Sequence, residues 1–454
     1  MTQILQQFFK KNPITGDALK ILTHFKMFKE KASFLQESQW WTKHQLEEYQ
    51  LDQLHKLLDH AYTNVPFYTK MFNDIGVKPK EIQDVKDLQK LPYVTKQVVK
   101  EHWNAFIAKN YPFKRLEYIT TGGSTGQPLG LYVEKGVGEA IYMAYYQTIL
   151  SRVNCHYTNK QIHFFGYDDL WNYQAFGRVL TLSTFFMTDK NLSLYVQKIK
   201  KFKPKFIIGF PSAFSMLANY MLKNNIHSFP SIKAIIPSGE TIIDSQFDLF
   251  KRAFQCKLIC SYGHNELSVM AGTCEDSRFY HLFPEYGITE IINEKGTPVS
   301  NDGDVGEIVA TGFCNDVFPL IRYKTEDICV CAKENCTCGR NYPLVKNIIG
   351  RVQQFIVTKS NRRIPLTGIY GLVAHCTQNV KECQIYQEKP GEIQLNIVKE
   401  TKFTNEDEKR IVKSFERKFQ GELIMSIFYV DKIPRTTSGK HQFLIQKLPV
   451  GYSE

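Results

Sequence analysis

Apolar residues recur at helical spacing in the first third of the chain. In residues 46–63 they fall on one side of a helix, and the VPFY run at 65–68 then ends that helix. The apolar positions of this helix are Leu51, Leu54, Leu57, Leu58 and Ala61. The preceding residues show the same spacing at Ile4, Leu5, Phe8, Leu19, Leu22 and Phe25. The pattern predicts a helical N-terminal segment, 1–115, that packs on the chain's own core, with a membrane-surface or partner contact as the alternative.

Short β-like runs alternate with helix-like segments between about 115 and 350. The predicted strands are 162–167, 205–210, 232–237 and 256–262, and the predicted helices between them are 212–225 and 244–254. This rhythm is typical of crossover units that form a largely parallel sheet covered by helices. Such sheets bind ligands at the carboxyl ends of their strands.

The pattern changes after about residue 285. The runs GITEII, GEIVATGF, FPLIRY and DICVCA predict a β-rich region, and the residues after Gly350 read as strand, helix at 405–420, strand and a glycine-bearing loop. The sequence therefore predicts an α/β protein. A large N-terminal domain, 1–350, has mainly parallel, helix-covered sheets and a β-rich subdomain, and a small α+β C-terminal domain covers 351–454.

The composition is that of a soluble globular protein. The chain has 454 residues, of which 43% are hydrophobic and 22% charged, enough for two or three domains. We find no apolar run near the ~18 residues that cross a bilayer, and no signal peptide in MTQILQQFFKKNP. We therefore expect a cytoplasmic protein without an integral membrane segment. Its 11 cysteines then fit reduced thiols or a metal site better than disulfides.

The net charge is +12, from 57 Lys+Arg against 45 Asp+Glu. A basic balance can attract nucleic acid, anionic lipid or anionic small molecules. KIKKFKPKF at 198–206 is a local cluster, but the aromatic residues do not alternate with arginines. We therefore expect no nucleic-acid partner and favour a solvated face or a phosphate-bearing small molecule.

The stretch YITTGGSTGQPLG, 118–130, concentrates glycines and hydroxyls. Gly122, Gly123 and Gly126 let backbone N–H groups approach an anion closely. Thr120, Thr121, Ser124 and Thr125 add hydroxyl donors. The stretch is not a Walker P-loop, because no Gly-Lys-Ser/Thr follows. It predicts a polyphosphate-binding loop, with a flexible surface turn as the alternative.

The order of these motifs resembles the adenylate-forming superfamily of acyl-CoA synthetases, peptide-synthetase adenylation domains and luciferases. Within it, the chain is similar to phenylacetate-CoA ligases and related capsule-biosynthesis proteins. The resemblance runs from LLDHAYTNVPFY through DLQKLPYVTK to PRTTSGK. It implies an ATP-dependent, AMP-forming ligase with a mobile C-terminal lid, which activates a carboxylic acid as an acyl-adenylate.

The resemblance also implies roles for individual residues. The loop from Thr120 to Pro128 would cradle the ATP phosphates, and Lys440, Glu266 and Thr121 would act in catalysis, with Glu266 holding Mg²⁺. Asp327 would bind the ribose, Arg351 would lie near ribose and phosphate, and Tyr262 would lie against adenine. The implied ATP/AMP-binding set is Thr120, Thr121, Gly122, Gly123, Ser124, Thr125, Gly126, Ser238, Gly239, Glu240, Ser261, Tyr262, Gly263, His264, Asn265, Asp327, Arg351 and Lys440.

The sequence departs from the family pattern at two places. Gln353 and Gln354 stand where the family usually has an acidic hinge, and His441 and Gln442 lack a basic residue often found after the lysine. In relatives the lid swings to admit coenzyme A, and 355–366 would face its pantetheine arm. With the hinge altered, two acceptors stay open: coenzyme A, or an amine or sugar hydroxyl.

Cysteines cluster in CVCAKENCTCGR, 329–340. Zn²⁺ prefers four tetrahedral sulfur or nitrogen ligands. By resemblance to some relatives, the implied structural zinc set is Cys274, His281, Cys336 and Cys338. Cys329 and Cys331 are the competing pair, and they fall in a strand-like run where apolar packing explains them.

Functions of other classes also stay open. A degenerate nucleotide-binding scaffold would fit the Gln-Gln hinge, and a zinc-bearing basic nucleic-acid binder would fit the charge. The acid itself is not readable, although Phe210 and the aromatic run 162–171 could accept a ring. A homodimer is left open.

Overall fold

The computed structural model describes most of the chain: residues 18–120, 129–242, 244–333, 335–351, 355–365, 373, 376–377, 379–436 and 439–448. Several predicted features lie outside these residues. They are the helical positions Ile4, Leu5 and Phe8, the loop residues Thr121, Gly122, Gly123, Ser124, Thr125 and Gly126, and the hinge residues Gln353 and Gln354.

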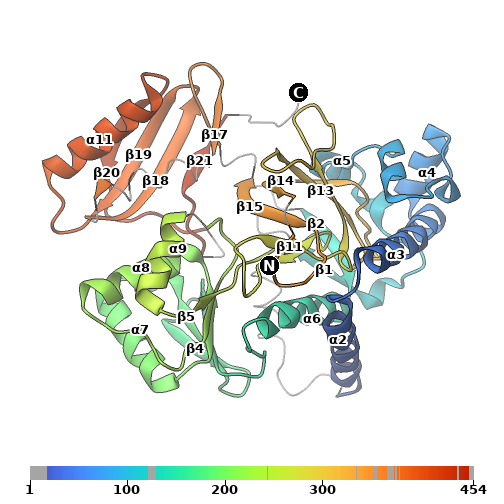
Figure 1. Ribbon diagram of the computed structural model, residues 1–454, viewed down its shortest axis with the longest axis horizontal. Helices are drawn as coiled ribbons and strands as arrows, with labels where there is room; N and C mark the ends of the chain where they lie inside the picture. Colours follow the sequence, from blue (N-terminus) through green and yellow to red (C-terminus); the bar gives the residue numbers. More distant parts are fainter. Residues whose placement is uncertain are drawn as a thin grey trace. The chain divides into compact units, whose positions relative to one another are not determined.

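The chain divides into two compact units, and each unit is built from two segments that are separated in the sequence (Figure 1). The first unit contains the residues through Tyr157 together with Ile259–Ile348. The second unit contains Thr158–Leu258 and the residues from Ile349 onward. The second unit therefore joins the middle of the chain to its C-terminal part.

Helices dominate the N-terminal part of the first unit, as predicted. The helix predicted at 46–63 is confirmed as α3: a capping box between Thr42 and Gln45 begins it, and one of its faces is buried. Helix α2 packs along α6, most of which is buried. The helices are α2 (Ala18–Ser38), α3 (Lys43–Asn64), α4 (Pro66–Ile75), α5 (Lys96–Glu101) and α6 (Val137–Ser151), with 3-10 turns η1 (Pro79–Glu81), η2 (Val85–Lys90), η3 (Trp103–Phe106) and η4 (Phe113–Arg115).

Two sheets complete the first unit. A hairpin of β1 (Leu116–Thr120) and β2 (Gly130–Glu134) flanks the glycine-rich stretch. A seven-stranded sheet has the order β12-β13-β14-β15-β11-β10-β9. Its strands are β9 (Ser261–Gly263), β10 (Met270–Gly272), β11 (Tyr280–Leu282), β12 (Gly287–Ile292), β13 (Val305–Gly312), β14 (Tyr323–Ala332) and β15 (Leu344–Arg351). The predicted β-rich region is thus present.

One predicted strand of this region is wrong. FPLIRY was expected to be extended, but β14 begins only at its last residue, Tyr323. Phe318, Leu320 and Ile321 are buried within a loop instead. Pro319 supplies no N–H to a ladder, and Arg322 has a left-handed φ of 49° that a strand does not accept.

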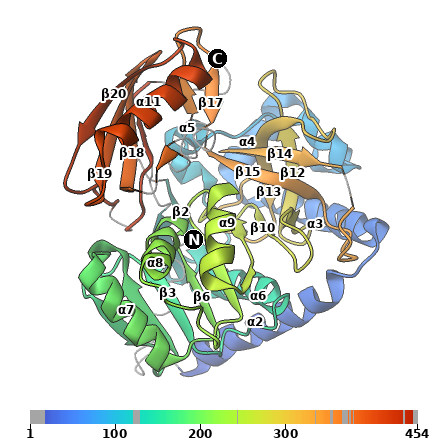
Figure 2. The same cartoon turned by 60° about the vertical axis from the view of Figure 1, so that its left-hand side comes forward.

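The second unit contains the predicted parallel sheet. Its order is β4-β5-β3-β6-β7-β8, with β5, β3, β6, β7 and β8 paired in parallel and β4 antiparallel at one edge. Helices α7, α8 and α9 pack beside the sheet (Figure 2). The elements are β3 (Gln161–Phe165), β4 (Trp171–Gln174), β5 (Val179–Ser183), η5 (Thr184–Phe186), α7 (Asp189–Phe202), β6 (Phe206–Gly209), α8 (Pro211–Lys223), β7 (Ala234–Pro237), α9 (Asp244–Phe254) and β8 (Lys257–Leu258).

The single strand predicted at 256–262 is also corrected. It divides into β8 of the six-stranded sheet and β9 of the seven-stranded sheet. Between them, the Cys260 N–H donates to Thr273 Oγ1 at 2.9 Å, and the Thr273 N–H donates to the Cys260 carbonyl at 2.9 Å. These bonds take the chain out of the first ladder, and periodicity could not reveal this because the apolar residues Leu258, Ile259 and Cys260 continue across the break.

The C-terminal residues of the second unit form an α+β layer. A four-stranded sheet of order β20-β19-β18-β21 packs on α11, and Ile411, Phe415 and Phe419 of that helix fill the core. The predicted helix at 405–420 is confirmed. The elements are β16 (Phe355–Val357), β17 (Arg363–Pro365), β18 (Val380–Lys389), β19 (Glu392–Lys399), α11 (Asn405–Phe419), β20 (Ile424–Tyr429) and β21 (Leu444–Gln446).

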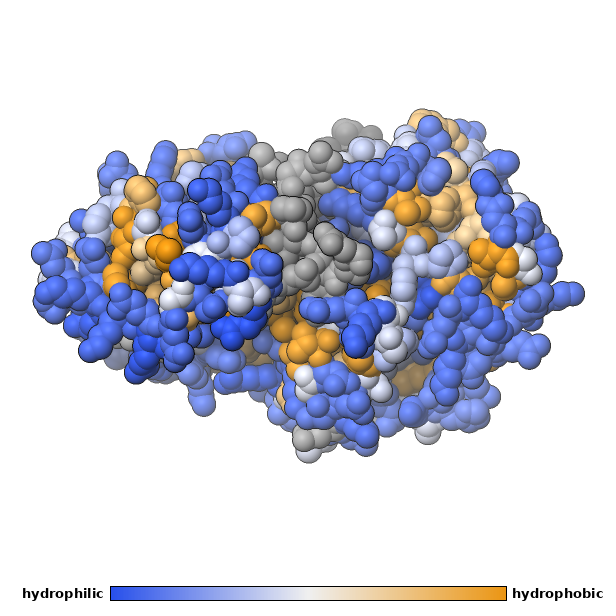
Figure 3. Space-filling model, turned by 90° about the horizontal axis from the view of Figure 1, so that it is seen from above, coloured by the Kyte–Doolittle hydropathy of each residue, from blue (hydrophilic) through white to orange (hydrophobic). Residues whose placement is uncertain are grey.

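The surface is mostly polar. On the face in Figure 3, hydrophilic residues predominate and hydrophobic residues gather in separate patches. Within the described residues, no helix has the length and apolar character needed to cross a membrane.

Candidate active site

The carboxyl ends of the parallel strands gather polar groups, as expected. Strand β7 ends at Pro237 and continues into Ser238, Gly239 and Glu240. The Glu240 carboxylate accepts hydrogen bonds from the Ser212 N–H at 2.9 Å, the Ser212 hydroxyl at 3.0 Å and the His441 N–H at 2.8 Å. Burial raises the pKa of Glu240, while these hydrogen bonds act in the opposite direction. Glu240 therefore fastens the residue after Lys440 to the strand ends.

The loop that carries Lys440 is closely packed against this edge. Gly439 has a φ of 79°, and a Cβ on it would lie 2.4 Å from the Gly166 Cα, just after β3. The Thr184 hydroxyl donates to the Gly439 carbonyl at 2.9 Å. Within the loop, the Lys440 N–H donates to Thr436 Oγ1 at 3.0 Å. Only glycine fits at 439, because both the backbone angle and the space exclude a side chain.

Lys440 itself lies at the end of β6. Its ammonium nitrogen is 5.9 Å from the centroid of the Phe210 ring. The next residue, His441, is buried, and its Nε2 lies 3.0 Å from the Cys383 carbonyl. Burial lowers the pKa of His441 to about 3, so its imidazole is neutral at pH 7. His441 therefore has a structural role and does not replace the basic residue that the family often has here.

The first unit brings together the residues expected to bind the nucleoside. Tyr262 on β9 donates its hydroxyl to the Asp327 carboxylate on β14 at 2.8 Å. Burial, followed by the Asp327 charge, raises the pKa of Tyr262 well above its usual value. Ser261 is buried and Gly263 ends the strand. The tyrosine ring is thus fixed beside a carboxylate that could accept hydrogen bonds from ribose hydroxyls.

The expected magnesium ligand follows β9 directly. Glu266 is buried, and its carboxylate oxygen lies 3.1 Å from His264 Nδ1. Asn265 is also buried, and its amide donates to the Thr120 carbonyl at 2.8 Å. Thr120 is the last residue of β1, where the glycine-rich stretch begins. The Glu266 carboxylate thus follows a residue that is hydrogen-bonded to the start of the glycine-rich stretch, and its oxygens are of the hard type that Mg²⁺ prefers.

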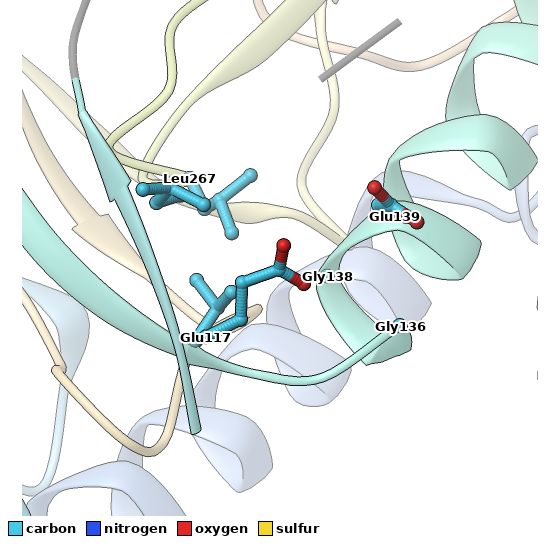
Figure 4. Close-up of a pocket in the computed structure, with 7 residues that line it drawn as sticks. Glu117, Gly136, Gly138, Glu139 and Leu267 are labelled. Carbon is cyan, nitrogen blue, oxygen red and sulfur yellow. The ribbon is translucent and has the colours of Figure 1, made fainter. Parts of the chain in front are cut away.

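A pocket beside these residues was missed in the sequence. It is small and lies between β1, β2 and the first turn of α6 (Figure 4). Figure 4 shows the Glu117 carboxylate directed toward Gly138, with Leu267 nearby. The lining residues are Glu117, Ile119, Val133, Gly136, Gly138, Glu139 and Leu267. Glu117 and Glu139, one on each side of the glycine-rich stretch in sequence, were the signal from which this pocket could have been predicted.

Arg351 is the last residue of β15, but its side chain lies outside the described residues. The expected nucleotide ligands are therefore divided between the two units. Tyr262, Glu266 and Asp327 belong to the first, and Glu240 and Lys440 belong to the second.

The four residues of the implied zinc set lie together in the first unit. Donor atoms of Cys274, His281, Cys336 and Cys338 all fall within 4.8 Å of one another. The sulfurs of Cys274 and Cys336 are 3.5 Å apart, and the Cys338 sulfur is 3.3 Å from His281 Nε2. Ligands of one tetrahedral Zn²⁺ would be about 3.5–3.8 Å apart. The geometry therefore fits this metal.

The surroundings of the cluster also suit a metal. His281 Nδ1 lies 3.1 Å from the Phe279 carbonyl, which leaves Nε2 directed at the sulfurs. Burial lowers the pKa of His281 to about 4, so the ring is neutral and able to ligate at pH 7. The competing pair, Cys329 and Cys331, is buried in β14 and does not join the cluster.

Comparison with known proteins identifies the class. The family model for AMP-binding enzymes matches residues 49–315, more than half of the chain, and the CapK C-terminal domain model matches 356–447. The chain therefore belongs to the AMP-binding enzyme family. It is an ATP-dependent, AMP-forming ligase, and the predicted superfamily, its phenylacetate-CoA ligase and capsule branch and the predicted α/β fold are confirmed. This assignment favours an enzyme over a degenerate scaffold.

Two curated relatives show the similarity in sequence. The chain is 24% identical to Protein CapK of Staphylococcus aureus over 417 residues, which cover 88% of this chain and 89% of CapK. It is 22% identical to a phenylacetate-coenzyme A ligase of Thermus thermophilus over 356 residues, which cover 75% and 78%.

Solved structures share the fold. A 2-hydroxyisobutyryl-CoA ligase in complex with an acyl-AMP, in its postadenylation state, has a TM-score of 0.71 at 16% identity, covering 90% of this chain and 93% of that one. An acyl acid amido synthetase has a TM-score of 0.59 at 14% identity, covering 92% and 94%.

Proposed function

We propose that this protein uses ATP and Mg²⁺ to convert a carboxylic acid to an acyl-adenylate and then transfers the acyl group to coenzyme A. The observation that carries the proposal is the position of Lys440. Its loop is fixed by Gly439 and Glu240 at the carboxyl ends of the parallel strands, where such sheets bind ligands.

In the proposed reaction, a carboxylate oxygen of the acid attacks the α-phosphorus of ATP and pyrophosphate leaves in line. Catalysis of this kind depends on positioning and charge stabilisation. The Lys440 ammonium would offset negative charge at the reacting carboxylate and α-phosphate. Mg²⁺, held by Glu266, would neutralise phosphate charge. Tyr262 and Asp327 would orient the adenine and ribose, and Ser238, Gly239 and Glu240 would line the adenine site.

Other parts of the nucleotide site are proposed from the resemblance. The stretch from Thr120 to Gly126 would donate backbone N–H groups to the phosphates, and Arg351 would lie near the α-phosphate. The division into an N-terminal domain, 1–350, and a mobile lid, 351–454, belongs to the same proposal. Support for a separate C-terminal part comes from the family model that matches 356–447.

An acceptor other than coenzyme A is the second candidate. Gln353 and Gln354 replace the usual acidic hinge residue, and an uncharged hinge could alter lid rotation. The resemblance to capsule-biosynthesis proteins suits an amine or sugar hydroxyl acceptor, and an acyl acid amido synthetase shares the fold. The similarity to phenylacetate-coenzyme A ligases supports coenzyme A. After adenylation, a thiol, amine or hydroxyl would attack the acyl carbon, and AMP would leave.

ATP–pyrophosphate exchange with a panel of carboxylic acids tests the first half-reaction. We expect at least one acid to support Mg²⁺-dependent exchange and to raise the thermal midpoint, because a ligand that binds the folded state stabilises it. If no acid supports exchange, the proposal fails. Adding coenzyme A, and separately amines or sugars, with the active acid then identifies the acceptor by the product formed.

We also propose that Cys274, His281, Cys336 and Cys338 bind one structural Zn²⁺. Purified protein should contain about one zinc per chain, and Cys336→Ser should lose it and unfold at lower temperature, because a structural metal contributes its binding energy to folding. Cys331→Ser is the matched control, since Cys331 lies in β14 outside the cluster. Equal zinc content in the two variants would contradict this ligand set.

A further inference from the structure

A row of cationic residues lines the amino-terminal edge of the six-stranded sheet. A Lys or Arg directly precedes each of β5, β3, β6 and β7, and β8 begins with a lysine. Backbone hydrogen bonds connect these residues or their immediate neighbours: Gln161 to Arg178, Lys205 to Lys160, Lys233 to Lys205, and Lys257 to Lys233. We name this row the cationic edge: Arg178, Lys160, Lys205, Lys233 and Lys257.

The end of α7 adds charge beside this row. Lys200, Lys201 and Lys203 are exposed, and Lys198 is half-buried. From residue 190 to 239 the sequence contains no Asp or Glu but has lysines at 190, 198, 200, 201, 203, 205, 223 and 233. Of these, Lys223 forms ion pairs with Glu400 at 3.1 Å and Asp189 at 3.7 Å, so it adds no unopposed charge. The carboxylates nearest in sequence to β4 and α7 are Asp168 and Asp169, which precede β4, and Asp189, which is the first residue of α7. The edge is therefore a concentrated positive surface.

An exposed aromatic side chain projects beside these charges. Phe176, at the tip of the turn between β4 and β5, is 92% exposed. Ala175, Phe176 and Gly177 have φ values of 47°, 53° and 76°, so three successive residues are left-handed. Such angles are uncommon for residues other than glycine. A solvent-facing phenylalanine in a turn of this kind contributes little to the core, and the turn directs it outward.

Aromatic and cationic side chains are interleaved between the turn and the row. The Lys198 nitrogen is 4.0 Å from the Trp171 ring centroid and 5.7 Å from that of Tyr173. Lys160 is 5.4 Å from the Phe202 ring centroid. Arg178, next to the turn, donates to the Thr158 carbonyl at 2.8 Å. The phenylalanine tip and the cationic edge therefore form one continuous surface.

We propose that this surface docks the protein on a membrane containing anionic lipid, with the cationic edge and α7 lysines on the headgroups and Phe176 inserted among them. Basic residues attract anionic headgroups, and an aromatic side chain adds apolar burial at the interface. The carboxyl edge, with Lys440 and Glu240, lies at the opposite ends of the same strands. Docking would leave it accessible.

A nucleic acid is the partner that this surface fits less well. Binding of single strands relies on aromatic rings that stack on bases. Lys198 already lies over the Trp171 ring at 4.0 Å, and Tyr173 is the one other described aromatic ring beside the turn that is substantially exposed, at 48%, so the surface offers few open platforms for bases. Phe176 is the most exposed of these aromatic side chains, as expected of one that inserts among headgroups.

Co-sedimentation of the full chain with phosphatidylcholine vesicles, with and without phosphatidylglycerol, tests the proposal. We expect binding only with phosphatidylglycerol and weakening with salt. Lys200→Gln with Lys201→Gln should weaken binding about 25-fold, from about five-fold per charge. Phe176→Ser should weaken it about ten-fold. The matched controls are Lys80→Gln with Lys109→Gln, and Phe113→Ser, all exposed in the first unit.

Thermal midpoints must stay equal among these variants, since all the changed residues are exposed. Binding that is lost in the surface variants and kept in the controls supports docking. Equal losses in both sets, absence of binding, or equal binding to neutral vesicles overturns it. Tight binding to DNA without binding to vesicles would replace it with a polynucleotide partner. ATP–pyrophosphate exchange is read separately, so failure of docking and failure of the proposed ligase reaction are distinguishable.

Discussion

The two edges of the six-stranded sheet differ in how their polar groups are satisfied: by hydrogen bonds within the protein at one edge and by solvent at the other. At the carboxyl edge, Glu240 accepts three hydrogen bonds and Gly439 packs against Gly166. At the amino edge, Lys200, Lys201 and Phe176 are exposed. Polar groups that are held by several hydrogen bonds position a small reactant, whereas exposed charges beside one apolar tip suit an extended partner. The proposed reaction and the proposed membrane docking would thus use opposite edges of one sheet.

The largest expected effect belongs to the carboxyl edge. Lys440→Ala should lower the rate of ATP–pyrophosphate exchange about 10²–10³-fold, because a charge-stabilising contact is worth about that much in a transition state. The ATP–pyrophosphate exchange assay, run with the acid that supports exchange, measures this rate. Lys432→Ala, an exposed lysine of the same C-terminal part, should keep the parental rate. Equal rates in the two variants would remove Lys440 from the reaction, and vesicle binding should not change in either.

Gly439→Ala tests whether close packing of the Lys440 loop against Gly166 is needed for stability and for exchange. The new Cβ would meet the Gly166 Cα at 2.4 Å and would require an unfavourable φ, so we expect about 1–3 kcal/mol lower unfolding free energy and slower exchange. Urea unfolding and the exchange assay measure the two effects. Gly421→Ala shares a positive φ of 86° but meets nothing within 4 Å. If both variants lose the same stability, close packing at Gly439 is not the cause.

The buried His441 gives the carboxyl edge a pH dependence. Its pKa is about 3 in the folded state, below its ordinary value of 6.5, so the unfolded chain binds more protons between these values. Its contribution to stability is complete above pH 6.5 and should fall toward pH 3, by up to about 1.4 kcal/mol per pH unit. His441→Gln should flatten this slope in urea unfolding, while the exposed His44→Gln should not. An unchanged slope would contradict burial of a neutral ring.

The smallest effect is expected at the amino edge. Phe176→Ser should change the unfolding free energy by less than about 0.5 kcal/mol, since surface substitutions of this kind are nearly neutral and the side chain is 92% exposed. Urea unfolding gives the value. A loss of several kcal/mol would mean that Phe176 supports the fold, and its exposure could no longer be ascribed to a partner.

The spacing of apolar residues along the chain predicted much of the architecture. Helices α3, α8, α9 and α11 and the parallel strands β3, β6 and β7 follow from periodicity, because one face of each helix and the interior of the sheet must be apolar, whereas β5 was not predicted. The prediction from spacing failed where a buried run was not a single strand. At Cys260, hydrogen bonds to Thr273 redirect the chain. At Pro319, the residue has no N–H to donate to a ladder, and β14 begins only at Tyr323. Apolar content reports burial, not hydrogen-bond partners.

The sequence alone determined the family, the order of its motifs and the types of residue needed for adenylation, since these depend on the nature and spacing of neighbouring residues. Only tertiary structure placed Gly439 against Gly166, joined Tyr262 to Asp327 and brought four metal-ligating side chains within 4.8 Å. It alone aligned Lys160, Arg178, Lys205, Lys233 and Lys257 in a row. The reason is physical: parallel pairing sets residues side by side that lie far apart in sequence, and no local pattern encodes which strands will pair.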